Sequence, residues 1–265
     1  MPFVLYLAWR FLVDGKAQTL LIIAGVAVGV SVQVFVTALI DGLQTDLIAQ
    51  TVGVQPHIVV EPPREAPRAV RPAEEGTEVV RRIARSSQRV RSIDGWPRLL
   101  EATLGRTGVR AASPKISGPG IAVHGEATSS VVVQAVPAED WNAIVPIAEH
   151  LVSGRFELEA RDTVIGSTLA EDLGVHVGDM MRLETAGGRG ELYTVRGIFD
   201  LGSKEANARW ALVSLRSGQM LFDLPGGATH LDVAVDDVFA ADRLARDIAA
   251  SSGLEAESWM TSNAQ

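Results

Sequence analysis

The longest apolar run of the chain lies near its N-terminus. Residues 17–40 carry no charged side chain, and Gln33 is the only strongly polar residue after position 19 of this run. As a helix with a rise of 1.5 Å per residue, the run would extend roughly 36 Å, enough to cross a hydrocarbon core of about 30 Å with some tilt. Its Val, Ile, Leu and Phe side chains outweigh the cost of inserting Gln33. The pattern therefore predicts a transmembrane helix over residues 17–40.

The flanks of this run distinguish a membrane anchor from a cleaved secretory signal. The apolar region of a signal usually has about 7–15 residues and ends at small residues, whereas this run is longer and leads into Asp41 and Asp46. We therefore expect an anchor. Arg10 and Lys16 precede the run, and positively charged flanks stay on the cytoplasmic side. The N-terminus is thus expected in the cytoplasm and residues 41–265 on the opposite side of the membrane.

Residues 1–16 are mostly apolar and aromatic. Such a segment can lie in the membrane interface as a short elbow, with Tyr6 and Trp9 at the depth of the lipid headgroups. The alternative is that it forms the irregular start of the transmembrane helix.

Three residues indicate that the predicted helix packs against other helices. Gly25 and Gly29 form a pair of small residues four positions apart, a spacing that allows another helix to approach closely. Gln33 lies on roughly the same face, and its amide would seek a partner on a neighbouring helix. We expect a helix within a bundle rather than a lone anchor.

Beyond residue 41, the spacing of apolar positions changes repeatedly between the periods of strands and of helices. It predicts strands at residues 55–61, 109–114, 120–124, 129–137, 180–185, 191–199, 210–213, 230–235 and 254–259. The sequence Ser-Gly-Pro-Gly at 117–120 is expected to bend the chain between two of them. Helices are predicted at residues 94–104, 139–151, 166–173, 214–222 and 238–250. Asp94 and Ser214 are expected as N-caps, and Phe239, Leu244 and Ile248 are expected to face inward. The fold class is α+β.

The composition excludes several classes of protein. The chain has no cysteine, which rules out zinc ribbons, iron–sulfur proteins, thiol enzymes and disulfide scaffolds. Its formal net charge of −8 argues against binding of nucleic acid. One basic cluster, five arginines within residues 81–91, is either a contact for anionic headgroups or an acidic partner, or a solvated stretch. The second interpretation is favoured because no apolar face accompanies the charges.

No pattern in the chain predicts catalysis, a cofactor or a metal. The five histidines are not spaced as metal ligands, and we expect them at the surface or in turns. The glycine-rich residues 187–190 lack the Lys-Ser/Thr of a phosphate-binding loop. Asp162, Asp172 and Asp179 could be imagined as paired carboxylates, but their positions at turns and helix edges favour structural roles. We predict a protein without catalytic, cofactor-binding or metal-binding residues.

Several segments together resemble the N-terminal part of MacB-like and LolC/LolE-like ABC transporter permeases, a group that includes FtsX-like members. The segments are LYLAWRFL at 5–12, PHIVV at 56–60, AASPKISGPG at 111–120, VIGSTLAEDLGVHVGD at 164–179, YTVRGIF at 193–199, GQMLF at 218–222 and SWMTSN at 258–263. Each motif is modest, but their order and spacing cover nearly the whole chain.

The resemblance implies a two-lobed extracytoplasmic domain after the first membrane helix. A porter-like α/β lobe would comprise about residues 50–137 and 228–263, and a β-rich lobe inserted into it would comprise about residues 138–227. Permeases of this group continue with three more membrane helices, so we expect this sequence to be a fragment. The resemblance also implies a cytoplasmic ABC ATPase as partner, a second permease copy or sibling in a dimer, and the lipid bilayer. Such proteins extract or expel lipoproteins, peptides, glycolipids or antibiotics.

One departure from this group lies between residues 185 and 191. Lipoprotein-releasing permeases carry a long hairpin there that recruits a carrier chaperone, whereas this chain has only Ala-Gly-Gly-Arg-Gly. A MacB-like or general exporter role is therefore favoured over lipoprotein sorting. Two alternatives remain: a single-pass anchored binding or scaffold domain without an ATPase, and a membrane-tethered hydrolase, for which the sequence offers no site.

Overall fold

The computed structural model describes residues 16–63 and 91–262. The chain divides into two compact units, Met1–Thr51 and Val52–Gln265. Residues 1–15 of the predicted interfacial segment at 1–16, and most of the basic cluster at 81–91, lie outside the described residues.

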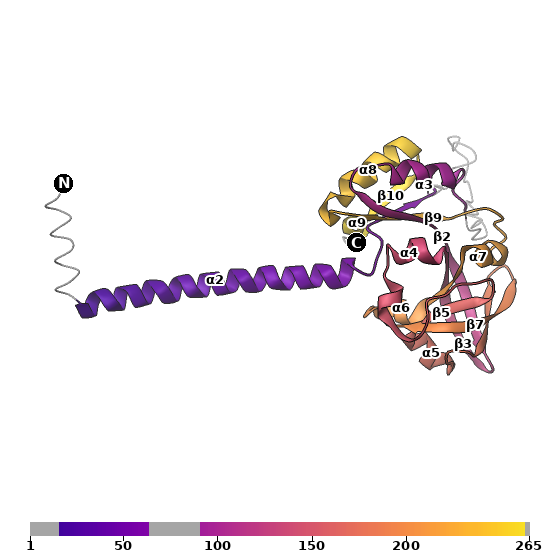
Figure 1. The fold of residues 1–265 in the computed structure, drawn as a ribbon, viewed down its shortest axis with the longest axis horizontal. Coiled ribbons are helices and arrows are strands. Elements are labelled where there is room, and N and C mark those ends of the chain that lie inside the picture. The colour runs from indigo at the N-terminus through magenta and orange to yellow at the C-terminus, as the bar shows by residue number, and fades with distance from the viewer. Residues whose placement is uncertain (1–15, 64–90, 263–265) are drawn as a thin grey trace, which may run out of the picture. The chain divides into compact units, whose positions relative to one another are not determined.

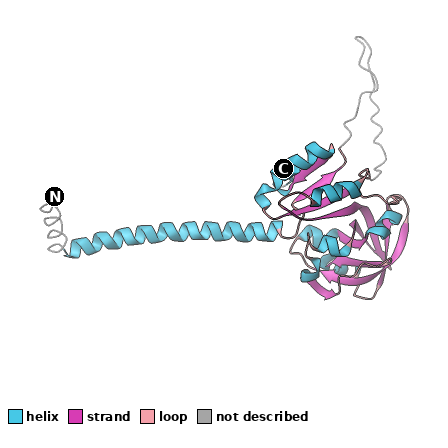
Figure 2. Ribbon diagram, turned by 45° about the horizontal axis from the view of Figure 1, so that its top comes forward, coloured by secondary structure: helices cyan, strands magenta, loops and turns pink. Residues whose placement is uncertain are grey.

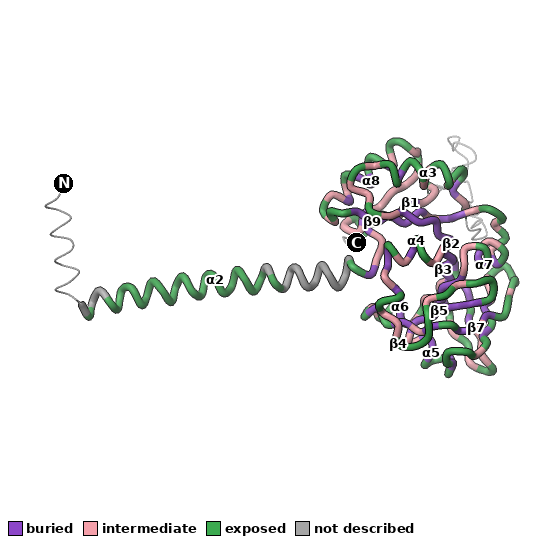
Figure 3. Tube along the Cα trace, viewed as in Figure 1, coloured by how far each residue is buried: buried purple, intermediate pink, exposed green. Residues whose placement is uncertain are grey.

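The first unit is built around one long helix, α2 (Lys16–Val52). Its segment Leu20–Ile40 has a mean hydropathy of 2.4, none of it buried, and is long and apolar enough to cross a membrane. Figure 3 shows this part of α2 as exposed along its length. The helix does not end at Asp41, where we expected the chain to leave it, but continues to Val52. Gly42 alone costs only about 1 kcal/mol in a helix, and no proline follows it within α2.

The second unit contains a four-stranded antiparallel sheet in the order β10-β1-β9-β2. Its strands are β10 (Glu255–Ser258), β1 (Ile58–Glu61), β9 (His230–Val235) and the first half of β2 (Val109–His124). One face is covered by α3 (Trp96–Leu104) and α8 (Ala241–Ser252), as Figure 1 shows. Ile58, Leu231 and Val233 on this face pack with Leu244 and Ile248 of α8. The alternation of apolar residues in the strands thus forms one core beneath two helices.

The second half of β2 leaves this sheet and joins six-stranded pairing that closes on itself. The pairs run β2–β3, β3–β8, β8–β5, β5–β7, β7–β6 and β6–β2. The further strands are β3 (Ala127–Val136), β5 (Asp162–Gly166), β6 (Met180–Thr185), β7 (Gly190–Phe199) and β8 (Trp210–Ser214). Because the pairing closes, these six strands have no free edge in the sheet. A further short strand, β4 (Leu151–Gly154), pairs with β7. Ile116, Val133, Leu183 and Val195 fill the interior.

Short helices connect and cover the barrel strands. They are α4 (Ala138–Asn142), the 3-10 helix Ile147–His150, α5 (Ser167–Leu173), α6 (Lys204–Arg209) and α7 (Leu215–Leu221). The 3-10 turn Val238–Ala240 leads into α8, and α9 (Trp259–Ser262) follows β10. Figure 2 shows the many strands of this unit, whereas the described part of the first unit is helical. The helix and strand content confirms the predicted α+β class.

Strand β2 differs most from the sequence-based expectation. We expected a bend at residues 117–120, but β2 is one continuous strand of 16 residues. Its glycines do not form a turn but allow neighbouring atoms to approach the strand closely. A Cβ on Gly118 would lie 2.4 Å from Cε1 of Phe222, and one on Gly120 would lie 2.9 Å from the carbonyl oxygen of Glu184.

The strand pairing divides the second unit at a different residue from the expected boundary between the two lobes. The expected lobes put residues 116–136 with the first sheet, whereas Ile116–Ala135 and Gly120–Thr185 are pairs of the barrel. The pairing changes partner within β2, after Lys115.

The helix predicted at residues 139–151 is replaced by two short pieces. Pro146 separates α4 from the 3-10 helix, because proline lacks the N–H that a helix interior requires. Strands β4 and β5 and helix α6 were not predicted.

Predictions at helix ends were partly right. Ser214 is the N-cap of α7 and accepts a hydrogen bond from the N–H of Ser217, as expected. Asp94 does not cap α3, because Gly95 occupies the N-cap position in a left-handed conformation with φ of 68°. Leu244 and Ile248 face inward as expected, but Phe239 is 63% exposed. It lies in the 3-10 turn before α8, outside the helical register of the other two.

Candidate functional site

A buried polar cluster lies on the face of the four-stranded sheet opposite α3 and α8. The β2–β9 register pairs Ser113 with Asp232 and Lys115 with His230. Because side chains alternate between faces along a strand, these four side chains share one face. Trp141 of α4 covers them. The residues around Trp141, including Val136 and Leu212 of the barrel and Ala234 of β9, form one apolar core between the sheet and the barrel.

The centre of this cluster is an ion pair between neighbouring strands. Nζ of Lys115 lies 2.6 Å from Oδ2 of Asp232, with side-chain exposures of 10% and 0%. The same carboxylate oxygen accepts a hydrogen bond of 3.0 Å from Nε1 of Trp141. Lys115 is the last residue of β2 that pairs with the sheet, and the next residue pairs with the barrel. The contact thus joins the sheet, the start of the barrel and α4.

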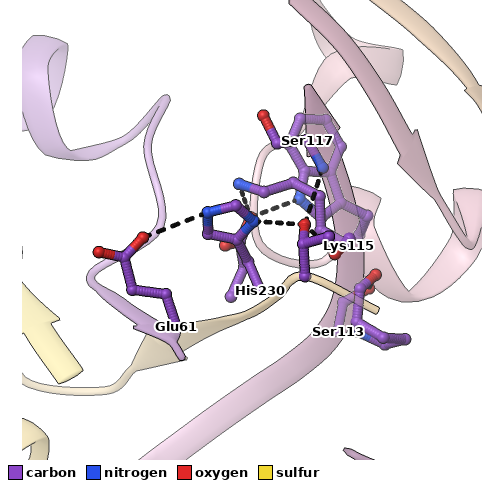
Figure 4. Close-up of polar contacts among 9 residues, drawn as sticks. Glu61, Ser113, Lys115, Ser117 and His230 are labelled. Atoms are coloured by element: carbon purple, nitrogen blue, oxygen red, sulfur yellow. Dashed lines mark hydrogen bonds and ion pairs between the residues drawn. The ribbon is translucent and has the colours of Figure 1, made fainter. Parts of the chain in front are cut away.

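A second set of contacts surrounds the ion pair toward the edge of the sheet. Oγ1 of Thr229 lies 2.6 Å from Nδ1 of His230 and donates to the carbonyl oxygen of Lys115 at 3.2 Å. Nε2 of His230 lies 3.4 Å from Oε2 of Glu61, so the imidazole joins β9 to β1. The backbone N–H of Ser117 donates to Oγ1 of Thr229 at 3.0 Å. Figure 4 shows these side chains converging from three strands.

This arrangement is suited to holding two structural parts together. Removing one partner of a buried ion pair strongly destabilises the folded protein, because the charge of the other partner stays buried without compensation. Oδ1 of Asp232 is buried without a partner among the described residues. The carboxylate therefore depends on Lys115 and Trp141 for its stabilisation.

The three carboxylates considered in the sequence have local contacts in separate elements. Oδ1 of Asp162, at the start of β5, lies 2.8 Å from Nε of Arg196, and this contact raises the pKa of Arg196. Oδ2 of Asp179 accepts a hydrogen bond from the N–H of His176 in the turn before β6. Asp172 is exposed on α5. Their contacts are those of turns and strand ends.

The histidines were expected at the surface or in turns, and His57 departs from this. His57 is 5% exposed, and its Nδ1 accepts a hydrogen bond from the N–H of Val235. His230 belongs to the polar cluster. His176 is exposed beside Asp179. Among residues 16–63 and 91–262, no group of three potential metal-ligating side chains comes together.

The helix-packing residues in α2 are surrounded by open space. A Cβ added to Gly25 or Gly29 would have no atom within 4 Å. The backbone carbonyl of Gln33 accepts a hydrogen bond from Oγ1 of Thr37. Packing of this face against another helix therefore stays a prediction.

Sequence reasoning missed the central residues of the polar cluster. Lys115, Asp232 and Trp141 come from segments far apart in the chain, and only the β2–β9 register brings the first two together. A signal existed in the sequence: Lys115 is one of three lysines, and it stands within an otherwise apolar and small-residue run, as Asp232 does in His-Leu-Asp-Val-Ala-Val. A buried charge in a strand calls for an opposite charge nearby.

Comparisons with known proteins place this chain in a family. The family model for the MacB-like periplasmic core domain matches residues 19–251. A curated relative, the lipoprotein-releasing system transmembrane protein LolC of Neisseria meningitidis serogroup B, is 24% identical over 232 residues, covering 83% of this chain and 49% of the relative. The chain thus spans about half the length of that relative.

Solved structures of similar domains have low sequence identity to this chain. The periplasmic region of MacB from Actinobacillus actinomycetemcomitans has a TM-score of 0.47 and 13% identity, covering 82% of this chain and 94% of that one. The extracellular domain of the ABC-type transporter YknZ from Gram-positive bacteria has a TM-score of 0.45 and 12% identity, with coverages of 61% and 87%. Both scores are below 0.5 and add nothing to the family match. Since that match covers most of the sequence, the chain belongs to the family of the MacB-like periplasmic core domain.

Proposed function

We propose that this chain is the N-terminal portion of the permease subunit of an ABC exporter of the MacB/LolCE type. In this proposal it lies in the bacterial inner membrane with its N-terminus in the cytoplasm. A cytoplasmic ABC ATPase partner hydrolyses ATP, and the permease converts this into movements of the periplasmic unit. The movements expel or extract a lipophilic, peptide or lipoprotein cargo. The permease itself is not the catalytic subunit.

The observation that carries the proposal is the family match over residues 19–251. It includes both the apolar segment of α2 and nearly all of the second unit, so the similarity extends over a membrane-type helix and a core domain in one chain. The LolC relative is described as a transmembrane protein of a lipoprotein-releasing system. A match over both the apolar helix and the core domain supports a permease more strongly than a match to either unit alone would.

The local structure where α2 ends supports transmission of movement. Helix α2 runs without a break to Val52, and Val54 already belongs to the apolar core around Trp141. Only Gly53 separates the end of the helix from that core. In this proposal, a displacement of the helix is passed to the domain through this short link. The Lys115–Asp232 pair would then keep the sheet and barrel from separating under load.

The short connection between β6 and β7 bears on how the proposed cargo leaves the permease. It comprises residues 186–189 and closes a tight hairpin. It offers no extended arm for a carrier chaperone, which favours direct export over handover to such a carrier.

Assembly with other helices is proposed through the face of α2 that carries Gly25, Gly29 and Gln33. Replacing Gly29 with leucine would block close approach of a neighbouring helix, whereas Val28→Leu changes an apolar side chain at the next position. We expect G29L to lower recovery of a second permease copy in mild detergent, and V28L to leave it unchanged. Equal recovery would count against this packing face.

The proposal is tested by purifying the tagged native protein from its own membranes in mild detergent and identifying the bound subunits by mass spectrometry. We expect an ATPase subunit and a second permease copy or sibling. Recovery of the protein without an ATPase would instead support the anchored binding or scaffold domain.

A further inference from the structure

A pocket of about 560 Å³ lies beside the β6–β7 hairpin, remote in the chain from the buried polar cluster. Its walls come from the hairpin, from α7 and from the segment before β5. We call it the hairpin pocket. Its volume falls within the range of sites for small organic ligands, about 300–1,000 Å³, and nothing in the transport proposal uses it.

Three arginines line the hairpin pocket: Arg161, Arg182 and Arg189. The acidic side chain among the described lining residues is that of Glu191, and Glu184 and Asp223 form ion pairs with Arg182 and Arg189. The pocket therefore carries no excess of positive charge. It gathers guanidinium N–H donors instead, and these match the oxygens of an oxyanion.

Two of these guanidinium groups are held in place from outside the lining. Nε of Arg182 lies 2.6 Å from Oε1 of Glu184. Nη2 of Arg189 lies 3.0 Å from Oδ1 of Asp223, and its Nη1 donates to the carbonyl oxygen of Met220 at 3.4 Å. A guanidinium has five N–H donors, so one carboxylate leaves donors available. Both groups are therefore positioned and still able to bind.

The guanidinium group of the third arginine forms no ion pair with a described residue. The carbonyl oxygen of Arg161 accepts a hydrogen bond of 2.8 Å from the N–H of Thr194. Its side chain lines the pocket with the buried residues Tyr193 and Ser217. Tyr193 and Ser217 are 2% and 0% exposed. Oγ of Ser217 donates to the carbonyl oxygen of Ala160 at 2.7 Å. The backbone that carries Arg161 is thus fixed while its guanidinium stays free for a ligand.

Another part of the pocket lining is apolar. Met220 is 57% exposed, and Leu221 beneath it belongs to the barrel core together with the ring of Tyr193. An exposed thioether next to core side chains provides an adaptable surface for a hydrocarbon group. A simple inorganic anion would leave this surface unused.

We propose that the hairpin pocket binds an amphiphilic phosphate, an oxyanion attached to a short apolar stem. The guanidinium groups of Arg161, Arg182 and Arg189 hold the phosphate oxygens, since planar paired N–H donors match that geometry. Met220 and Leu221 contact the stem. The inference is independent of the proposed transport function, because binding is a property of this chain alone.

The test uses the full chain in nanodiscs of phosphatidylcholine and measures binding by microscale thermophoresis. The probes are dihexanoyl phosphatidic acid, dihexanoyl phosphatidylcholine and inorganic phosphate. We expect phosphatidic acid to bind more tightly than either of the others. Equal binding of phosphatidylcholine would overturn the role of the arginines, and equal binding of inorganic phosphate would overturn the role of the apolar wall. Absence of binding by phosphatidic acid would overturn the proposal as a whole.

Variants locate the binding in this pocket. Arg161→Gln removes one charged donor without disturbing any contact between described residues, and we expect roughly a tenfold loss of affinity for phosphatidic acid. Met220→Asp should abolish the preference over inorganic phosphate. The matched control is Arg98→Gln, at an exposed position on α3, which should leave affinity unchanged. If R161Q and R98Q bind equally well, the ligand does not occupy this pocket.

Discussion

Replacing Lys115 with methionine tests whether the buried ion pair holds the sheet and the barrel together. Methionine keeps the length of the aliphatic part of lysine and removes the charge. The carboxylate of Asp232 would stay fully buried, 0% exposed, with Nε1 of Trp141 as the remaining hydrogen-bond donor to it among the contacts at this site.

The expected size of the effect follows from the burial of both partners. Removing one member of a buried pair typically costs about 3–5 kcal/mol, because the other charge loses its compensation without regaining water. The cost should be partly reversed by Asp232→Asn in the same chain. This second change removes the orphaned charge and leaves an amide oxygen to accept from Trp141. We expect the two effects to deviate from additivity by about 2 kcal/mol.

The assay is urea unfolding of the full chain in nanodiscs, followed by tryptophan fluorescence, for which Trp141 is a buried reporter. The matched control is Lys204→Met, the same chemical change at an exposed lysine of α6. Exposed substitutions of this kind usually change the free energy of unfolding by no more than about 0.5 kcal/mol. If K115M is as stable as K204M, or if the double variant shows simple additivity, the reasoning about this site is wrong.

Three further predictions concern packing and titration in the second unit. Gly218→Ala should lower the free energy of unfolding in urea by about 1–3 kcal/mol, because its Cβ would lie 2.0 Å from Cβ of Ala135. This cost should exceed the gain from the higher helix propensity of alanine. The control is Gly105→Ala, whose Cβ has room, and equal stability of the two variants would contradict the prediction. Burial, and then Glu191, raises the pKa of Tyr193 above the usual 10.0. The resulting stability is present below pH 10 and lost as pH rises through the folded-state pKa. An ultraviolet titration of a Tyr6→Phe chain, which leaves Tyr193 as the remaining tyrosine, should show a midpoint above 10.0, and a midpoint at or below 10.0 would contradict this. The N–H of Gly202 and the amide of Asn207 lower the pKa of Asp200 below the usual 3.8, so this contribution is lost as pH falls through the lowered value. Asn207→Ala should move the pKa of Asp200 upward in an NMR titration, and an unchanged pKa would exclude the amide as a cause.

Elements determined by local sequence were predictable. The apolar segment of α2 follows from composition alone, and Ser214 caps α7 because its hydroxyl can reach the N–H of Ser217. Helix α5 ends at Gly174, which adopts φ of 63°, a conformation that glycine takes easily.

Elements that depend on tertiary contacts were not predictable in this way. The glycines of β2 looked like a turn, but they allow Phe222 and the β6 backbone to approach the strand. The polar cluster requires the register between β2 and β9, which lie more than a hundred residues apart in the chain. The hairpin pocket likewise brings together the segment before β5, the β6–β7 hairpin and α7.

We propose that ATP hydrolysis by a partner moves the second unit of a permease pair. A spin label at Glu171→Cys, an exposed position on α5, in a complex whose other subunits and segments carry no labelled cysteine, reports one distance between two copies. The label is measured by electron paramagnetic resonance in the complex purified from native membranes, without nucleotide and with ATP and vanadate. We predict that the distance between copies shifts on trapping the nucleotide. A distance that stays the same, or the lack of any distance between copies, would contradict the account.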